Sequence, residues 1–79
     1  MMPYGNNYTR LAGIIREFNH HRAVIEFPRY QKKIPVPTRF IRSELCDQLN
    51  QEHELEIETW YLKKNRVLPL YEPKHLKNN

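Results

Sequence analysis

The fold depends most on one stretch, His53-Glu54-Leu55-Glu56-Ile57-Glu58-Thr59-Trp60-Tyr61-Leu62, in which side chains of two kinds alternate. Alternation with a period of two predicts a β-strand with one buried and one solvated face. Leu55, Ile57, Thr59 and Tyr61 share one face, and Glu54, Glu56, Glu58 and Trp60 share the other. A slip of one residue would turn three glutamates toward the core, so the pattern also fixes the register of the strand.

Two further strands are predicted upstream, in residues 8–18 and 22–27, because both segments are rich in β-branched and aromatic side chains. The short polar segment 19–21 between them predicts a hairpin loop. Gly13, within the first strand, predicts a bulge or a sharp bend. The buried face of the second strand is expected to carry Ala23, Ile25 and Phe27.

Two shorter patterns complete the expected sheet. Residues 33–37 predict a third strand at an edge of the sheet, because Pro35 and Pro37 cannot donate backbone hydrogen bonds. The polar segment 63–65 predicts a turn, and residues 66–70 predict the last strand.

One helix is predicted between the third and fourth strands. Ile41, Leu45 and Leu49 recur at four-residue steps with Cys46 beside them, which makes one apolar stripe. Thr38 or Ser43 would cap its start, and Asn50 would end it. A helix of about two to three turns is too short to be stable alone, so we expect it to pack on the sheet.

These elements predict a mainly β fold, a five-stranded small barrel with one short helix between strands three and four. The 79 residues have room for one domain, with a core in about residues 8–70 and polar tails at 1–7 and 71–79. The sequence contains no apolar stretch of membrane-spanning length, and its N-terminus lacks the apolar centre of a signal peptide. Cys46 is the single cysteine, which excludes an intrachain disulfide, so we expect a cytoplasmic protein without a membrane partner.

The net charge of +4 is unevenly distributed along the chain. Residues 10–42 sum to +6, residues 44–58 to −6 and residues 63–79 to +4. One interpretation is that the two basic segments meet in space while the acidic strand faces elsewhere. The other is that the acidic strand neutralises its basic neighbours by cross-strand pairing. The sequence leaves both open.

Three segments carry a resemblance to a known family: the glycine-led strand 13–17, the alternating strand 22–27, and the long strand, basic turn and closing strand of 54–67. Together they resemble the oligonucleotide/oligosaccharide-binding barrel, in its S1-type subgroup as in bacterial translation initiation factor one. The resemblance covers roughly residues 11–70 and is one of pattern and spacing. SH3-like barrels share such patterns and are the alternative.

The resemblance implies a nucleic-acid surface on strands two and three and on the flanking loops. Carried onto this sequence, it assigns binding to Arg16, Phe18, Arg22, Arg29, Tyr30, Lys32, Lys33, Lys63, Lys64 and Arg66. Two features depart from the family pattern: an aromatic-rich RNA-binding signature of the cold-shock type is missing, and prolines interrupt strand three.

The residues themselves point in the same direction. Segment 29–33, Arg-Tyr-Gln-Lys-Lys, interleaves a ring with cations, and stacking of a base on a ring is worth about 1–3 kcal/mol. Segment 63–66 adds three cations at a turn, and phosphate contacts are additive and salt-dependent. Solvated loops would have the same composition. We expect a protein that binds RNA or single-stranded DNA.

A protein partner is the alternative ligand. In this alternative the chain is a protein–protein adaptor or inhibitor subunit. Its strand face of Glu54, Glu56, Glu58 and Trp60 would dock on a basic partner protein, or its proline-containing edge would accept a partner strand. A homodimer built in the same way is a special case. Trp60 would anchor such an interface if it is exposed, whereas a bulge near Thr59 or the N-terminal tyrosines would cover it.

Catalysis, metal binding and a cofactor are not predicted. The four histidines and one cysteine do not have the spacing of a zinc site. Cys46 falls on the apolar stripe of the predicted helix, where a core role is expected. Gly5 and Gly13 are the only glycines, so the chain has no phosphate-binding glycine loop.

Overall fold

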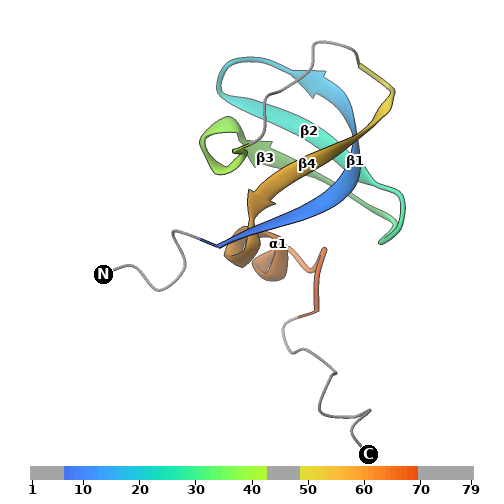
Figure 1. Ribbon diagram of the computed structural model, residues 1–79. Coiled ribbons are helices and arrows are strands. Elements are labelled where there is room, and N and C mark those ends of the chain that lie inside the picture. The colour runs from blue at the N-terminus through green and yellow to red at the C-terminus, as the bar shows by residue number, and fades with distance from the viewer. Residues whose placement is uncertain (1–6, 43–48, 70–79) are drawn as a thin grey trace, which may run out of the picture.

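The computed structural model describes residues 7–42 and 49–69, which form one antiparallel sheet followed by a helix. The elements in chain order are β1 (Tyr8–Phe18), β2 (Arg22–Phe27), β3 (Lys32–Pro37), the 3₁₀ turn η1 (Thr38–Phe40), β4 (Glu52–Glu58) and α1 (Thr59–Lys64). The strand order in the sheet is β3-β2-β1-β4 (Figure 1). The mainly β prediction is confirmed, as are the first three strands, the hairpin loop at 19–21 and the edge position of β3.

The long strand β1 bends and pairs with a different neighbour in each half (Figure 1). Its first half, from Tyr8 to Ile14, pairs with β4, and its second half, from Ile14 to Phe18, pairs with β2. The predicted bulge lies between Ile15 and Glu17 rather than at Gly13. Gly13 allows close packing instead, because a Cβ atom there would lie 2.8 Å from Cγ2 of Ile25.

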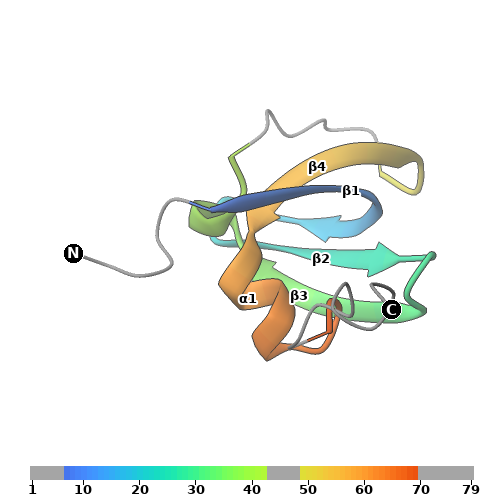
Figure 2. The ribbon, with the colours of Figure 1, turned by 60° about the horizontal axis from the view of Figure 1, so that its bottom comes forward.

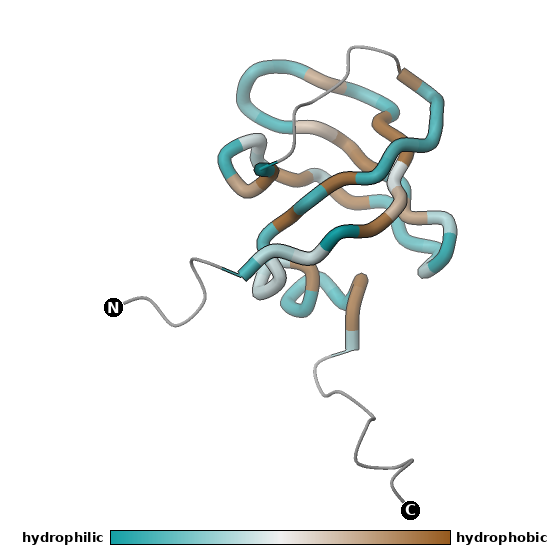
Figure 3. Tube along the Cα trace, in the orientation of Figure 1, coloured by the Kyte–Doolittle hydropathy of each residue, from teal (hydrophilic) through white to brown (hydrophobic). Residues whose placement is uncertain are grey.

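The core lies on one face of the sheet, and hydropathy alternates along the strands accordingly (Figure 3). Buried side chains come from every strand and from the segment after β4: Leu11, Ile15, Ala23, Ile25, Phe27, Val36, Leu55, Ile57, Leu62 and Val67. The predicted inward faces of β2 and of residues 53–58 are therefore confirmed. The opposite face, which we call the outer face, carries the glutamates of β4.

The predicted strand 53–62 is wrong beyond Glu58, because Thr59–Lys64 form α1. The alternation of side chains along this segment explains the difference. As a strand, this segment would place Trp60 and Leu62 among the glutamates on the outer face. As a helix it buries Leu62 completely, and the backbone N–H groups of Val67 and Leu68 donate to the Leu62 carbonyl at 2.9 and 3.2 Å. Figure 2 shows α1 beside the end of β3.

The described part of the last predicted strand, residues 66–69, forms no strand, since Arg66 is in a turn and Val67 and Leu68 are in a bend. Leu70 lies outside the described residues. The described sheet therefore has four strands and is not closed into a barrel. The Ile41 backbone is extended (φ −108°, ψ 120°) and forms a bridge with Ile57 of β4, so it does not belong to the predicted helix. Ser43, Leu45 and Cys46 lie outside the described residues. The helix that the structure does describe follows the strands.

Candidate nucleic-acid interface

Three aromatic rings meet where η1 packs against α1. The ring of Phe40 lies 5.2 Å from that of Trp60 and 5.0 Å from that of Tyr61, and the Trp60 and Tyr61 rings are 5.7 Å apart. All three side chains are half-buried. We call these residues the aromatic cluster. Trp60 is thus neither an exposed strand residue nor a core residue.

Two hydrogen bonds hold the aromatic cluster in place. The Tyr61 hydroxyl donates to the Pro35 carbonyl at 2.7 Å, which fastens α1 to the free edge of β3. The Trp60 indole N–H donates to the Glu58 carboxylate. Burial raises the pKa of the Tyr61 hydroxyl, and the positive charge of Arg39 partly opposes that rise. The rings are therefore positioned before any ligand arrives.

Cations surround the aromatic cluster. The Arg39 guanidinium lies 4.7 Å from the centre of the Phe40 ring, and the Lys64 ammonium lies 5.9 Å from that of Trp60. Lys63 precedes Lys64 on the same helix, lies on the adjacent helix face and is half-buried. Within residues 7–42 and 49–69, none of these three cations forms a salt bridge. Their charge is available to an anionic ligand.

On the outer face, by contrast, cations are neutralised by carboxylates. Arg10 lies across from Glu56 in the β1–β4 pairing and bonds it at 2.9 Å, with Glu54 at 3.6 Å. Arg42 contacts Glu56 at 3.0 Å. The hydrogen bonds from Arg10 and then Arg42 hold the pKa of Glu56 below its ordinary value. Cross-strand neutralisation, one of the two interpretations of the charge pattern, is therefore observed.

Arg16, the first of the predicted nucleic-acid residues, is also neutralised by a carboxylate. Its guanidinium contacts the Glu26 carboxylate at 2.9 Å and the Asn50 side chain at 2.8 Å. Phe18 and Arg22 lie at the β1–β2 hairpin and are exposed.

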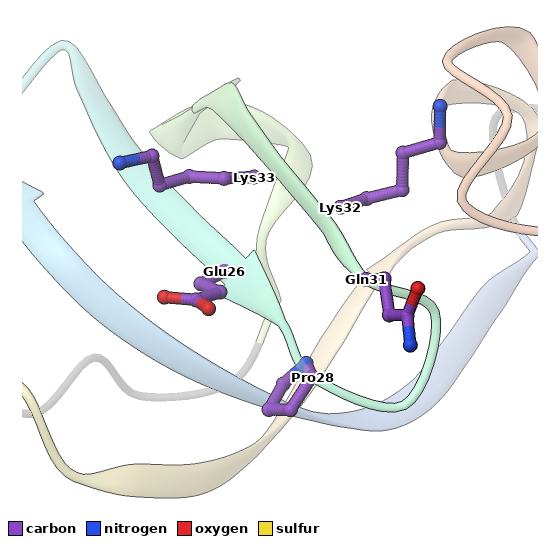
Figure 4. A pocket seen from close by; sticks show the side chains of 5 residues that line it. All are labelled: Glu26, Pro28, Gln31, Lys32 and Lys33. Carbon is purple, nitrogen blue, oxygen red and sulfur yellow. The ribbon is translucent and has the colours of Figure 1, made fainter.

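The predicted basic loop does not form one surface. Lys32 and Lys33 point to opposite sides of β3, as strand alternation requires, and Lys33 lies on the side of its cross-strand partner Glu26 (Figure 4). Tyr30 packs against the core, and Arg29 is exposed. A shallow pocket of about 380 Å³ lies here, lined by Glu26, Pro28, Gln31, Lys32 and Lys33.

Of the predicted residues in segment 63–66, Lys63 and Lys64 belong to α1, and Arg66 is exposed just beyond it. The sequence interpretation missed Arg39 and Phe40. The sequence does place Arg39 next to the Phe40 ring. The rings that Phe40 contacts, Trp60 and Tyr61, lie about twenty residues downstream, and no local pattern predicts that contact.

The residues of the alternative protein interface are largely engaged within the fold. Glu56 bonds two arginines, Glu54 contacts Arg10, and Glu58 accepts from Trp60. The edge of β3 offers no backbone N–H donor at Pro35 or Pro37, because proline has none. A partner strand would find one carbonyl of this edge already bonded to Tyr61.

Two kinds of feature are absent from the described residues. No helix in them has the length and apolar character needed to cross a membrane. They also contain no group of three or more His, Cys, Asp or Glu side chains placed to hold a metal ion.

Comparison of the chain with protein-family models, with curated proteins and with solved structures finds no match, so function is inferred from these residues alone.

Proposed function

We propose that this protein binds single-stranded nucleic acid, RNA or DNA, through the aromatic cluster and the cations around it. One observation carries the proposal: three half-buried rings lie within 5.7 Å of one another, and Arg39 and Lys64 lie over two of them. Neither of these cations, nor Lys63 on the adjacent face of α1, has a carboxylate partner in the described part of the chain. Bases stack on such rings, and phosphates need such cations. The role is binding without a catalytic step.

Single strands fit this surface better than duplexes do. A ring gains stacking energy only from a base whose face is free, and duplex bases are stacked on each other. The rings of Trp60 and Tyr61 meet nearly at right angles, at 88°, so they cannot act as one flat platform. Individual unstacked bases are the ligands that such a surface accommodates.

The pairing of the strands supports a further part of the proposal, that the fold is a variant of the small nucleic-acid-binding barrel. Strands of small barrels bend at bulges, and β1 carries a bulge between Ile15 and Glu17 and changes its partner from β4 to β2 at Ile14. At the two sheet edges, Tyr61 bonds β3, and Ile41 and Arg42 contact β4. These segments occupy edges that a fifth strand would otherwise close. An SH3-like arrangement is the alternative.

The test uses Trp60, the only tryptophan, as its own reporter. Indole fluorescence is followed during titration with 12-nucleotide oligothymidine, oligouridine and a duplex, at about 50 mM and about 200 mM salt. We expect saturable fluorescence changes with the single strands, weaker binding of the duplex and a steep loss of affinity with salt. The variant K63E/K64E should bind at least about tenfold more weakly.

A matched variant separates the location of charge from its amount. R29E/K33E also replaces two cations by two acids, so its net charge equals that of K63E/K64E, but both changes lie away from the aromatic cluster. We expect its affinity to fall less than about threefold. Absence of binding at low salt, or equal losses in the two variants, would refute the proposal.

A further inference from the structure

A small pocket lies on the side of α1 next to the aromatic cluster. It has a volume of about 250 Å³ and is lined by Thr9 of β1, Thr59 and Lys63 of α1, and Leu68 and Pro69. Residues four apart in a helix share a face, so Thr59 and Lys63 form one face of α1. Trp60 and Lys64 form the adjacent face, about 100° away. Trp60 is therefore the ring of α1 whose face adjoins this pocket, since Tyr61 lies about 100° further around the helix.

The polar groups of the pocket suit a phosphate. The hydroxyls of Thr9 and Thr59 are 2.7 Å apart and share one hydrogen bond. That bond uses one hydroxyl proton, so the second proton remains free to donate. Lys63 adds an ammonium group without a salt bridge within the described ranges. An O–H donor beside an ammonium group recognises an anion with several acceptor oxygens.

Among the described residues next to the pocket, one backbone donor and one carboxylate already have partners elsewhere. The backbone N–H of Thr59 is already bonded to the Asn7 carbonyl at 2.9 Å. The carboxylate of Glu58, the residue before it, accepts the Trp60 indole N–H. Leu68 and Pro69 supply an apolar wall.

We propose that this pocket binds a phosphate monoester, the terminal phosphate of the strand whose bases contact the aromatic cluster. The inference rests on the proposed function and adds to it a preference for phosphorylated ends. A terminal phosphate monoester carries more charge than an internal diester and three free oxygens, so it gains more from a pocket that holds both a hydroxyl donor and Lys63.

The test compares one short oligothymidine in three forms: with a 5′-phosphate, with a 3′-phosphate and without either. For the wild-type protein we expect one phosphorylated form to bind about tenfold more tightly than the unmodified strand. Inorganic phosphate, added as a competitor, should reduce that gain. This competition shows whether free phosphate can fill the pocket in place of the phosphate at the end of a strand.

The decisive variant is T9V/T59V. It removes both partners of one hydrogen bond and keeps the side-chain shapes, a change that is nearly neutral for stability. We expect it to bind the unmodified strand as the wild type does and to retain a gain of about threefold or less from the phosphate, the contribution of Lys63 alone. The control is T38V, which changes a threonine of η1 outside the pocket and should keep the full gain.

Each outcome has one meaning. A phosphate gain that is missing in the wild type, or equal in T9V/T59V, refutes the pocket and leaves the proposed function standing. Absence of binding by all three oligonucleotides refutes the proposed function itself. Thermal unfolding of each variant shows whether a loss of binding reflects a loss of the fold.

Discussion

Gly13 shows how much a single position contributes to this sheet. It lies where β1 passes from β4 to β2, and it is buried between the two neighbouring strands. A methyl group there would be 2.8 Å from Cγ2 of Ile25 and 3.0 Å from Cδ1 of Leu55. Leu55 can rotate its end away, but Cγ2 of a fully buried isoleucine is held by the β-branch. The close packing of Ile25 and Leu55 over this point of β1 therefore requires a residue without a side chain.

We predict that Gly13→Ala destabilises the protein by about 1–2 kcal/mol. Overpacking a dense core costs about 1–3 kcal/mol, and the lower flexibility of the unfolded alanine chain returns part of it. Urea unfolding followed by Trp60 fluorescence measures the difference. The control is Ala12→Ser, at the residue directly before Gly13 and on the outer face, which should change stability by less than about 0.5 kcal/mol. An alanine variant as stable as the wild type would contradict this account of Gly13.

At the scale of elements, β1, β2 and β3 were predictable because strand signals are local. Alternation, the polar loop 19–21 and the prolines of β3 each act within a few residues. The parity of β4 was equally clear up to Glu58. Beyond that point alternation misled, although Trp60 and Leu62 already fell on the glutamate face, where a strand would expose them. The segment forms a helix because Leu62 is then buried in the core together with Val67, whose backbone N–H bonds the Leu62 carbonyl. This is a tertiary effect, which local alternation does not reveal.

The candidate site divides in the same way. Lys63 and Lys64 stand out in any charge profile. Phe40 contributes only because η1 is brought against α1, and that contact joins segments far apart in the sequence. Lys32 and Lys33 look like one basic pair in the sequence, yet a strand necessarily separates neighbours onto opposite faces.

Tyr61 links α1 to the sheet, and its hydroxyl is the group to test. We predict that Tyr61→Phe lowers the free energy of unfolding at neutral pH by about 0.5–1.5 kcal/mol, the worth of one hydrogen bond. Because burial raises the pKa of Tyr61 in the folded state, the neutral hydroxyl stabilises the fold below the unfolded pKa near 10. That contribution is lost as the pH rises through the higher folded pKa.

The wild type should therefore lose stability above about pH 10, and Tyr61→Phe should lose less over the same range. Chemical unfolding at a series of pH values measures both curves. Tyr30→Phe is the control, because the Tyr30 hydroxyl has no hydrogen bond within the part of the chain that the structure describes. Equal stability of Tyr61→Phe and the wild type at neutral pH would show that the bond to Pro35 contributes nothing.

For the whole molecule, the arrangement of charge is more informative than its sum. Two groups of cations in the fold differ in what they contact. Arg10, Arg16 and Arg42 are bound to carboxylates on the outer face, where they connect the strands. Arg39 and Lys64 lie beside rings of the aromatic cluster, with Lys63 on the adjacent face of α1, and none of the three has such a partner among the described residues. Other exposed cations also form no salt bridge among the described residues, so it is the position beside the rings that distinguishes the group at η1 and α1; these others are Arg22, Arg29, Lys32, Lys33 and Arg66.

This difference predicts opposite effects for two substitutions that each remove one positive charge. Arg10→Gln deletes contacts with Glu54 and Glu56, so it should lower the melting temperature and leave the affinity for oligothymidine within about twofold. Lys64→Gln should leave the melting temperature unchanged, weaken binding and reduce the slope of log affinity against log salt by about 0.7, the share of one single-strand phosphate contact. Thermal unfolding and titration at several salt concentrations give both quantities for both variants. Equal losses of affinity would mean that only net charge matters, and that the aromatic cluster has no special position in binding.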